Sequence, residues 1–143
     1  MSNTQFIFIN KEDVPTQEQW QISIDKLNLP VRIQIDKDLT PFEDEGFIPC
    51  IWGNSNGDVG FEIFYEVASD ACEDDDELLE VANGKDYCIS MCWGGEIKDC
   101  LAVLIASCAL ASSFNAIVSY EGENPESVEG QLTGIQSELS KML

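Results

Sequence analysis

Carboxylates are the side chains with the most chemical potential in this sequence, and they are concentrated in its middle. No basic residue occurs between Lys37 and Lys85. Such groups can transfer protons in pairs, ligate hard cations or attract a positively charged partner. The candidate site carboxylates of this stretch are Glu43, Asp44, Glu45, Glu62, Glu66, Asp70, Glu73, Asp74, Asp75, Asp76 and Glu77.

No sequence pattern supports proton transfer or metal binding by these carboxylates. Acidic residues are so abundant that no pair stands out as a general acid and base. A calcium-binding loop needs oxygen ligands at alternating positions and a glycine at the sixth. The run Glu73–Glu77 has neither the spacing nor the glycine. We therefore predict no metal site and no cofactor.

Other catalytic arrangements are also missing. The sequence contains no histidine, which removes the commonest general base and the Ser/His and Cys/His nucleophile pairs. Gly94-Gly95, between a predicted strand and a predicted helix, resembles a phosphate-binding turn. However, Glu96 and Asp99 would repel the anion there. We expect a binding protein rather than an enzyme.

The six cysteines are Cys50, Cys72, Cys88, Cys92, Cys100 and Cys108. Neither the pair four apart in a strand nor the pair eight apart in a helix has the spacing of a structural zinc site. The sequence begins Met-Ser-Asn-Thr-Gln, without the basic region and cleavage site of a signal peptide. We predict a reducing, cytoplasmic location in which these residues are free thiols that pack as small apolar side chains.

Net charge sets the strongest limit on partners. The chain has 27 acidic and 7 basic residues, for a net charge of −20. Such a field repels phosphate, so direct binding to nucleic acid or to an anionic membrane is disfavoured. A basic protein is the simplest complement, and the alternative is that the acidic surface only maintains solubility.

The carboxylates must be positioned by regular elements, and residues 59–67 show the clearest two-residue alternation, which predicts a strand. One side carries Glu62, Phe64 and Glu66, a mixed surface that suits either an interface or a solvated sheet face. Phe64, Tyr65 and Trp52 are the aromatic residues that could anchor a partner. The opposite side is predicted to be core and consists of Val59, Phe61, Ile63, Tyr65 and Val67.

Further strands are predicted at residues 6–9, 31–35, 47–52, 87–93 and 116–120. The loop 53–58 suggests a hairpin with Asn56-Gly57 at the turn, and Pro49 indicates an edge strand or a bulge.

Three helices are predicted. The first is capped by Thr16 and Gln19, the second covers residues 100–114, and the third begins at Asn124-Pro125. The third carries an apolar stripe made of Val128, Leu132, Ile135, Leu139 and Met142. The acids of 73–77 can also open a short helix that docks through Leu78, Leu79 and Val81.

Together these elements predict one α+β domain over residues 1–143. Its sheet is mostly antiparallel and twisted, with five to six strands, and it packs against the three helices. The helix over residues 100–114 is expected to be buried. The apolar run 101–118 is long enough to suggest a membrane span, but Ser107, Ser112, Ser113 and Asn115 interrupt it. We therefore predict no membrane association.

Three stretches, the acidic middle and the order of elements carry a resemblance to a known group of proteins. The stretches are Gly46–Cys50, Gly60–Glu62 and Cys92–Gly95. With them, the chain resembles the small acidic immunity proteins of bacterial toxin systems, including those of contact-dependent growth inhibition. The resemblance implies a cytoplasmic protein that binds one cognate toxin domain, often a basic nuclease, and blocks its active site.

In physical terms, carboxylates would pair with the toxin's lysines and arginines, and the acidic field would speed association. Two other classes fit the same charge. One is an acidic regulator or nucleic-acid mimic that binds another basic protein, and the other is an enzyme that acts on a cationic substrate.

Overall fold

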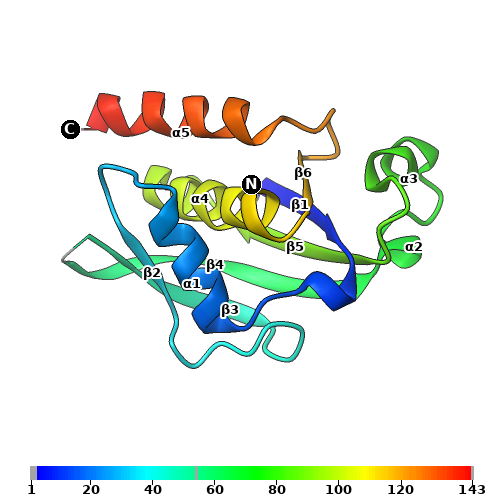
Figure 1. Cartoon of the computed structure of the whole chain (residues 1–143), viewed down its shortest axis with the longest axis horizontal. Helices are drawn as coiled ribbons and strands as arrows, with labels where there is room; N and C mark the ends of the chain where they lie inside the picture. Colours follow the sequence, from blue (N-terminus) through cyan, green and yellow to red (C-terminus); the bar gives the residue numbers. More distant parts are fainter. Residues whose placement is uncertain (1–2, 54, 143) are drawn as a thin grey trace.

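Six strands form one antiparallel sheet in the computed structural model, which describes residues 3–53 and 55–142 (Figure 1). The order across the sheet is β2-β3-β4-β5-β1-β6, and every neighbouring pair is antiparallel. The predicted α+β class and strand number are confirmed. The strands are β1 (Asn3–Ile9), β2 (Ile33–Ile35), β3 (Gly46–Trp52), β4 (Ser55–Val67), β5 (Tyr87–Trp93) and β6 (Ile117–Tyr120).

The described residues also form five α-helices and one 3₁₀ turn, η1 (Lys11–Asp13). The number exceeds the predicted three because the acidic segment folds into two short helices, α2 and α3. The helices are α1 (Gln17–Lys26), α2 (Ala68–Ala71), α3 (Asp76–Ala82), α4 (Ile97–Ser113) and α5 (Val128–Met142).

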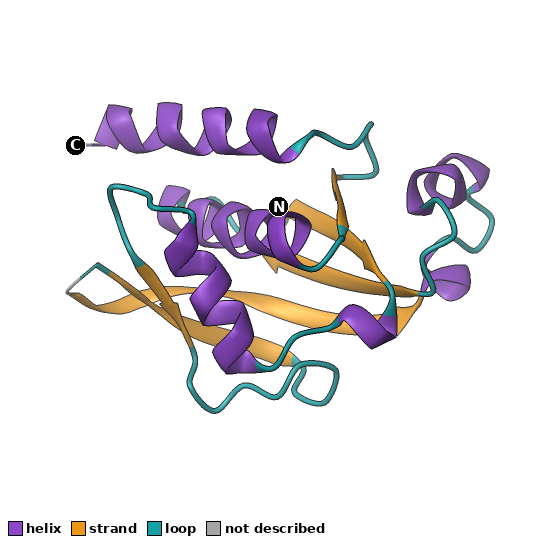
Figure 2. Ribbon diagram, in the orientation of Figure 1, coloured by secondary structure: helices purple, strands orange, loops and turns teal. Residues whose placement is uncertain are grey.

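The helices form two groups: α1, α4 and α5 lie together, and the short helices α2 and α3 lie at one end of the sheet (Figure 2). On one face, α1 and α4 cover the sheet, and α5 packs against α4. On the other face, α2 and α3 bury a smaller cluster around Phe8 and Cys88, with Leu78 and Ala82. Neighbouring strand residues point to opposite faces, so the two clusters share the same strands. We call the face that carries Phe8 and Cys88 the outer face.

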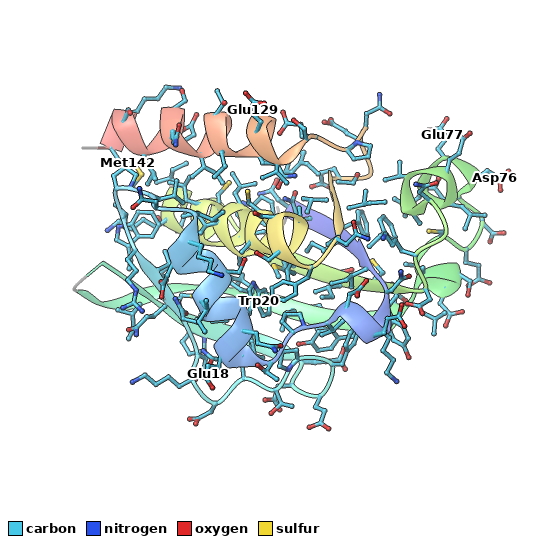
Figure 3. The ribbon with its side chains drawn as sticks, in the orientation of Figure 1. Glu18, Trp20, Asp76, Glu77, Glu129 and Met142 are labelled. Atoms are coloured by element: carbon cyan, nitrogen blue, oxygen red, sulfur yellow. The ribbon has the colours of Figure 1, made fainter. Side chains whose placement is uncertain are left out.

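The helix α4 is buried on almost every side, as predicted, because it is apolar around its circumference and lies between the sheet, α1 and α5. Two buried hydrogen bonds fix α1 to it. Trp20 Nε1 donates to the carbonyl of Ala106 at 3.0 Å, and Ser23 Oγ donates to the carbonyl of Ala109 at 3.0 Å. Figure 3 shows Trp20 at this junction. The predicted capping box is also present, since Thr16 Oγ1 accepts from Gln19 N.

Four of the six cysteines are buried, namely Cys50, Cys72, Cys88 and Cys108. Burial raises the pKa of Cys50 and of Cys88 to about 12. At neutral pH these thiols therefore stay protonated and pack as small apolar side chains, which agrees with the role expected from the sequence.

The hairpin between β3 and β4 turns earlier than the sequence suggested. Trp52 pairs with Ser55, so β4 already includes Asn56 and Gly57. Gly53 has a φ of +61° and lets the chain reverse immediately after β3. Position 54 of the expected loop lies outside the described residues.

The strand β3 is not an edge strand, because it lies between β2 and β4. The ladder with β2 ends at Cys50, so Pro49 has no β2 residue opposite it. The register with β4 shifts between Cys50 and Trp52. The predicted irregularity is therefore present, next to the proline.

The last helix begins later than predicted. Helix α5 starts at Val128, and Ser127 Oγ accepts a hydrogen bond from Gly130 N at 3.0 Å. Its cap is therefore Ser127 rather than Asn124. The predicted apolar stripe is confirmed, with Ile135 and Leu139 buried.

Two predicted core positions are exposed. Leu79 is 52% exposed because α3 is short and docks through Leu78 and Ala82 instead. Val67 is also exposed, and Tyr65 is half-buried, because β4 passes into α2 at Val67. In the described part of the chain, no helix is long and apolar enough to cross a membrane.

Candidate protein-binding surface

The alternation of β4 places three predicted site residues on the outer face. Glu62, Phe64 and Glu66 are all exposed there, whereas Phe61 and Ile63 are buried on the opposite side. The predicted mixed surface of carboxylates and an aromatic ring is therefore present on this strand.

A second aromatic residue, Phe47, joins this surface from β3. It lies directly opposite Glu62 in the β3–β4 register and is 62% exposed, while Phe64 is 40% exposed. Phe47 was not among the predicted site residues, because the continuous apolar run 47–52 hid its alternation. Pro49 lies on the same side of β3 and is also exposed. Because alternate residues of a strand share a face, the spacing of Phe47 and Pro49 could have predicted that Phe47 is exposed.

The backbone holds the ring of Phe47 in place. A β-carbon built on Gly60 would lie 2.5 Å from Phe47 Cζ and 2.5 Å from the carbonyl oxygen of Ile48. The ring therefore lies across the glycine, a close approach that requires the absence of a side chain there. Asp99 Oδ1 accepts a hydrogen bond from Gly60 N at 3.0 Å and fixes the strand at the same residue.

At the end of β4, three predicted carboxylates come together around a depression of about 340 Å³ that we call the end hollow. Glu45, Glu66 and Asp70 line it, although they are up to 25 positions apart (70 − 45) in the sequence. Glu66 also belongs to the outer face, whereas Tyr65 and Tyr87 point to the opposite side of the sheet, so the end hollow shares one residue with the outer face. The structure thus assembles one acidic site from three separate elements.

Aromatic rings form the floor of the end hollow. Phe42 packs against Tyr65 and Tyr87, with ring centroids 4.9 Å and 4.7 Å apart. Lys11 Nζ lies 5.4 Å from the centroid of Tyr87. Lys11 also lines the end hollow, so the hollow already holds one positive charge of the chain on a ring face. Burial raises the pKa of Tyr65 to about 12, so its phenol stays neutral.

Three of the predicted carboxylates also stabilise the fold. Asp44 Oδ2 accepts from Thr40 N at 2.8 Å, and Glu45 Oε2 accepts from Tyr65 N at 3.0 Å. Asp75 caps α3, since its Oδ1 accepts from Leu78 N at 2.9 Å. The contacts of Asp44 and Asp75 are local, and the cap by Asp75 agrees with the short helix predicted after the acidic run. The contact of Glu45 with Tyr65 joins residues that lie far apart in the sequence and depends on the tertiary arrangement.

The remaining carboxylates of the acidic segment face solvent. Glu73, Asp74, Asp76 and Glu77 are exposed on the α2–α3 unit, as is Glu43 in the loop before β3. Figure 3 shows Asp76 and Glu77 at one end of the molecule, directed away from its body. The α2–α3 unit packs on the outer face, so these charges lie on the same side of the sheet as Phe64.

Trp52 is separated from this surface. It is 8% exposed and belongs to the core on the opposite side of the sheet, where Lys98 Nζ lies 5.8 Å from its ring centroid. Its position in the β3 alternation, two residues from Cys50, sets this orientation. The aromatic anchors available on the outer face are therefore Phe47 and Phe64.

No carboxylate of the site forms an ion pair with another described residue. Within the described residues, ion pairs form only between Arg32 and Asp25 and between Lys141 and Glu138. No group of three or more His, Cys, Asp or Glu in that part of the chain is arranged to hold a metal ion. The arrangement can attract and bind cationic groups.

Comparison of the chain with protein-family models, with characterised proteins and with solved structures finds no match.

Proposed function

We propose that the protein is a cytoplasmic immunity protein that binds a basic toxin domain through its outer face and blocks the toxin's active site. One observation carries the proposal. Phe47 and Phe64 are exposed beside Glu62 and Glu66, on a part of the sheet that no helix of the described chain covers. Exposed aromatic residues next to uncompensated carboxylates are typical of surfaces that bind basic proteins.

The two kinds of residue have different roles in such a complex. The phenylalanines would be buried by the partner and supply most of the binding free energy, as aromatic anchors usually do. The carboxylates would steer the partner during approach and select against other proteins. The end hollow would take a lysine or arginine side chain of the toxin beside the carboxylates of Glu45, Glu66 and Asp70.

The protein would inhibit the toxin by covering its active site, which requires no catalytic residue in this chain. A toxin that acts on nucleic acid must hold phosphate with basic side chains, and the same side chains would pair with the outer-face carboxylates. Because these charges are exposed, we expect association to slow strongly as the salt concentration rises.

Growth rescue tests the function directly. The toxin domain encoded beside this chain is produced in a sensitive bacterium with and without the protein, and we expect growth only in its presence. A neighbouring gene for a metabolic enzyme, or a toxin that kills equally in both strains, would contradict the proposal.

Charge variants test the surface. Glu62→Gln with Glu66→Gln should lower the association rate with the toxin domain about tenfold at low salt, measured by surface plasmon resonance. The matched control is Glu18→Gln with Glu129→Gln, two exposed glutamates on α1 and α5 (Figure 3). Equal rates for both double variants would show that the outer face is not the binding surface.

A further inference from the structure

A cavity of about 610 Å³ lies on the helix-covered side of the sheet, where β5 and β6 end. Trp93 of β5 and Val118 of β6 line it from the sheet, and Leu104 of α4 and Ile135 of α5 line it from the helices. Its volume is within the range of binding pockets. The proposed toxin-binding surface does not include it.

Two exposed apolar side chains border this cavity. Ile97, the first residue of α4, is 45% exposed, and Tyr120, the last residue of β6, is 42% exposed. The ring of Tyr120 lies beside that of Trp93, with centroids 6.0 Å apart. Large apolar groups that stay exposed at a cavity are typical of binding sites, and a partner can reach both of them.

A second hollow of about 1140 Å³ adjoins the cavity. Glu123, Asn124 and Glu126, from the loop between β6 and α5, line both spaces. Val81 of α3 and Ile117 of β6 also line the second hollow, and β6 contacts both α3 and α4 (Figure 1). The two spaces together form one elongated surface, which we call the loop cleft. An extended chain fits this shape better than a compact molecule.

The charge of the loop cleft is negative throughout. Glu96 lines the cavity, Glu77 and Glu80 line the second hollow, and Glu123 and Glu126 line both. Among the described residues, no lysine or arginine lines either space, and none of these glutamates forms an ion pair. The loop cleft therefore favours cationic groups next to apolar ones and repels anions.

Three hydrogen bonds hold the loop that joins the two spaces. Ser119 Oγ donates to the carbonyl of Glu123 at 2.6 Å, and Glu123 N donates to the carbonyl of Tyr120 at 2.9 Å. Gln131 Nε2 donates to the carbonyl of Glu126 at 3.0 Å. The backbone of both glutamates is therefore fixed before a partner arrives, which lowers the entropic cost of binding.

We propose that the loop cleft binds an extended basic segment of a protein partner. An aromatic or aliphatic side chain of the segment enters the cavity beside Ile97 and Tyr120, and its lysines or arginines lie beside the glutamates. A second copy of this chain is a poor occupant, because it would bring a net charge of −20 against the same carboxylates. No described residue of β3 or β4 lines the loop cleft, so the proposal does not depend on the outer-face function.

Synthetic peptides test the proposal on the full chain. The first peptide has two phenylalanines between pairs of lysines, the second has serines in place of the phenylalanines, and the third has glutamates in place of the lysines. Calorimetry measures affinity, and the indole NMR signal of Trp93 reports on the cavity. We expect the first peptide to bind and shift this signal, the second to bind at least about tenfold more weakly, and the third not to bind.

Variants with matched controls locate the site. Ile97→Ser should weaken binding of the first peptide about tenfold. Ile22→Ser should leave it unchanged, because Ile22 is similarly exposed, at 48%, but lies on α1 and lines neither space. Circular dichroism confirms that both variants fold.

The charges are tested in the same way. Glu123→Gln with Glu126→Gln should weaken binding of the first peptide several-fold at low salt. Glu12→Gln with Glu18→Gln removes two exposed glutamates that line neither space and should have a much smaller effect.

Three results would overturn the proposal. Equal affinity for the phenylalanine and serine peptides would show that only nonspecific charge attraction operates. A larger loss with Glu62→Gln and Glu66→Gln than with the Glu123 and Glu126 variants would place the peptide on the outer face. If 2-phenylethylamine binds as tightly as the first peptide, the cavity is a small-molecule site and not a peptide site.

Discussion

The ring of Phe47 lies across Gly60, and a β-carbon at that glycine would lie 2.5 Å from the ring. This contact joins β3 to β4 at the outer face and holds an aromatic side chain in an exposed position. A residue that looks like part of a buried strand thereby becomes the most exposed of the large apolar side chains on this face.

Gly60→Ala tests this contact. We expect the substitution to lower the free energy of unfolding by about 1–3 kcal/mol, because the new methyl group would collide with Phe47 and with the backbone oxygen of Ile48. Urea denaturation measures the effect. Adding Phe47→Ala should recover only part of the loss, since the backbone oxygen remains. Full recovery would mean that the ring alone causes the collision.

Gly134→Ala should have the opposite effect. The position is helical, and a β-carbon there meets no atom within 4 Å, so the gain in helix propensity should stabilise the protein by about 1 kcal/mol. The control is Gly130→Ala, whose β-carbon would lie 3.3 Å from the capping Ser127 Oγ and should gain less. Thermal unfolding compares the two variants, and a larger gain at Gly130 would contradict the packing described for α5.

Phe64→Ala should separate binding from folding. The side chain is 40% exposed, so its removal should change stability by less than about 1 kcal/mol, yet it should weaken binding to a cognate toxin domain by about 2 kcal/mol. Isothermal titration calorimetry measures the affinity. Ile22→Ala removes an exposed apolar side chain from α1, outside the outer face, and should leave affinity unchanged. Equal losses for both variants would remove Phe64 as an anchor.

Asp75→Ala should destabilise α3 by about 1 kcal/mol, because the Asp75 carboxylate caps the helix by accepting from Leu78 N. Asp75→Asn should preserve the cap while removing the charge. Hydrogen exchange of the α3 amides measures local stability, and Asp76→Ala is the control because Asp76 is not the cap residue. If all three variants exchange alike, the cap contributes nothing to stability.

Alkaline pH should destabilise the protein through its buried thiols. Burial raises the pKa of Cys50 and Cys88 to about 12 and that of Cys108 to about 11. A raised pKa stabilises the fold fully below the ordinary thiol value, and this contribution is lost as pH rises toward the folded value. We expect the urea midpoint to fall between pH 9 and pH 11, with a shallower fall in Cys108→Ala.

Iodoacetamide labelling at pH 8 checks the same point. The thiols of Cys50, Cys88 and Cys108 should react slowly in the native protein and rapidly in urea. Native labelling at the unfolded rate would show that they are accessible.

The sequence by itself determined the α+β class, most strands and the faces of the clearest ones. Period-two alternation in β4 is local, so it identified Glu62, Phe64 and Glu66 as one exposed surface. The capping box at Thr16 and the apolar stripe of α5 were likewise readable, because both depend on residues three or four positions apart.

Only the tertiary structure decided what lies beside that surface. Phe47 joins it because β3 pairs with β4 in a register that places Phe47 opposite Glu62. Trp52 lies in the core on the opposite side of the sheet, beyond the register shift that follows Cys50. The end hollow combines elements that are far apart in the chain. Local sequence patterns carry no information on such contacts, since strand order and helix docking depend on how the whole core packs.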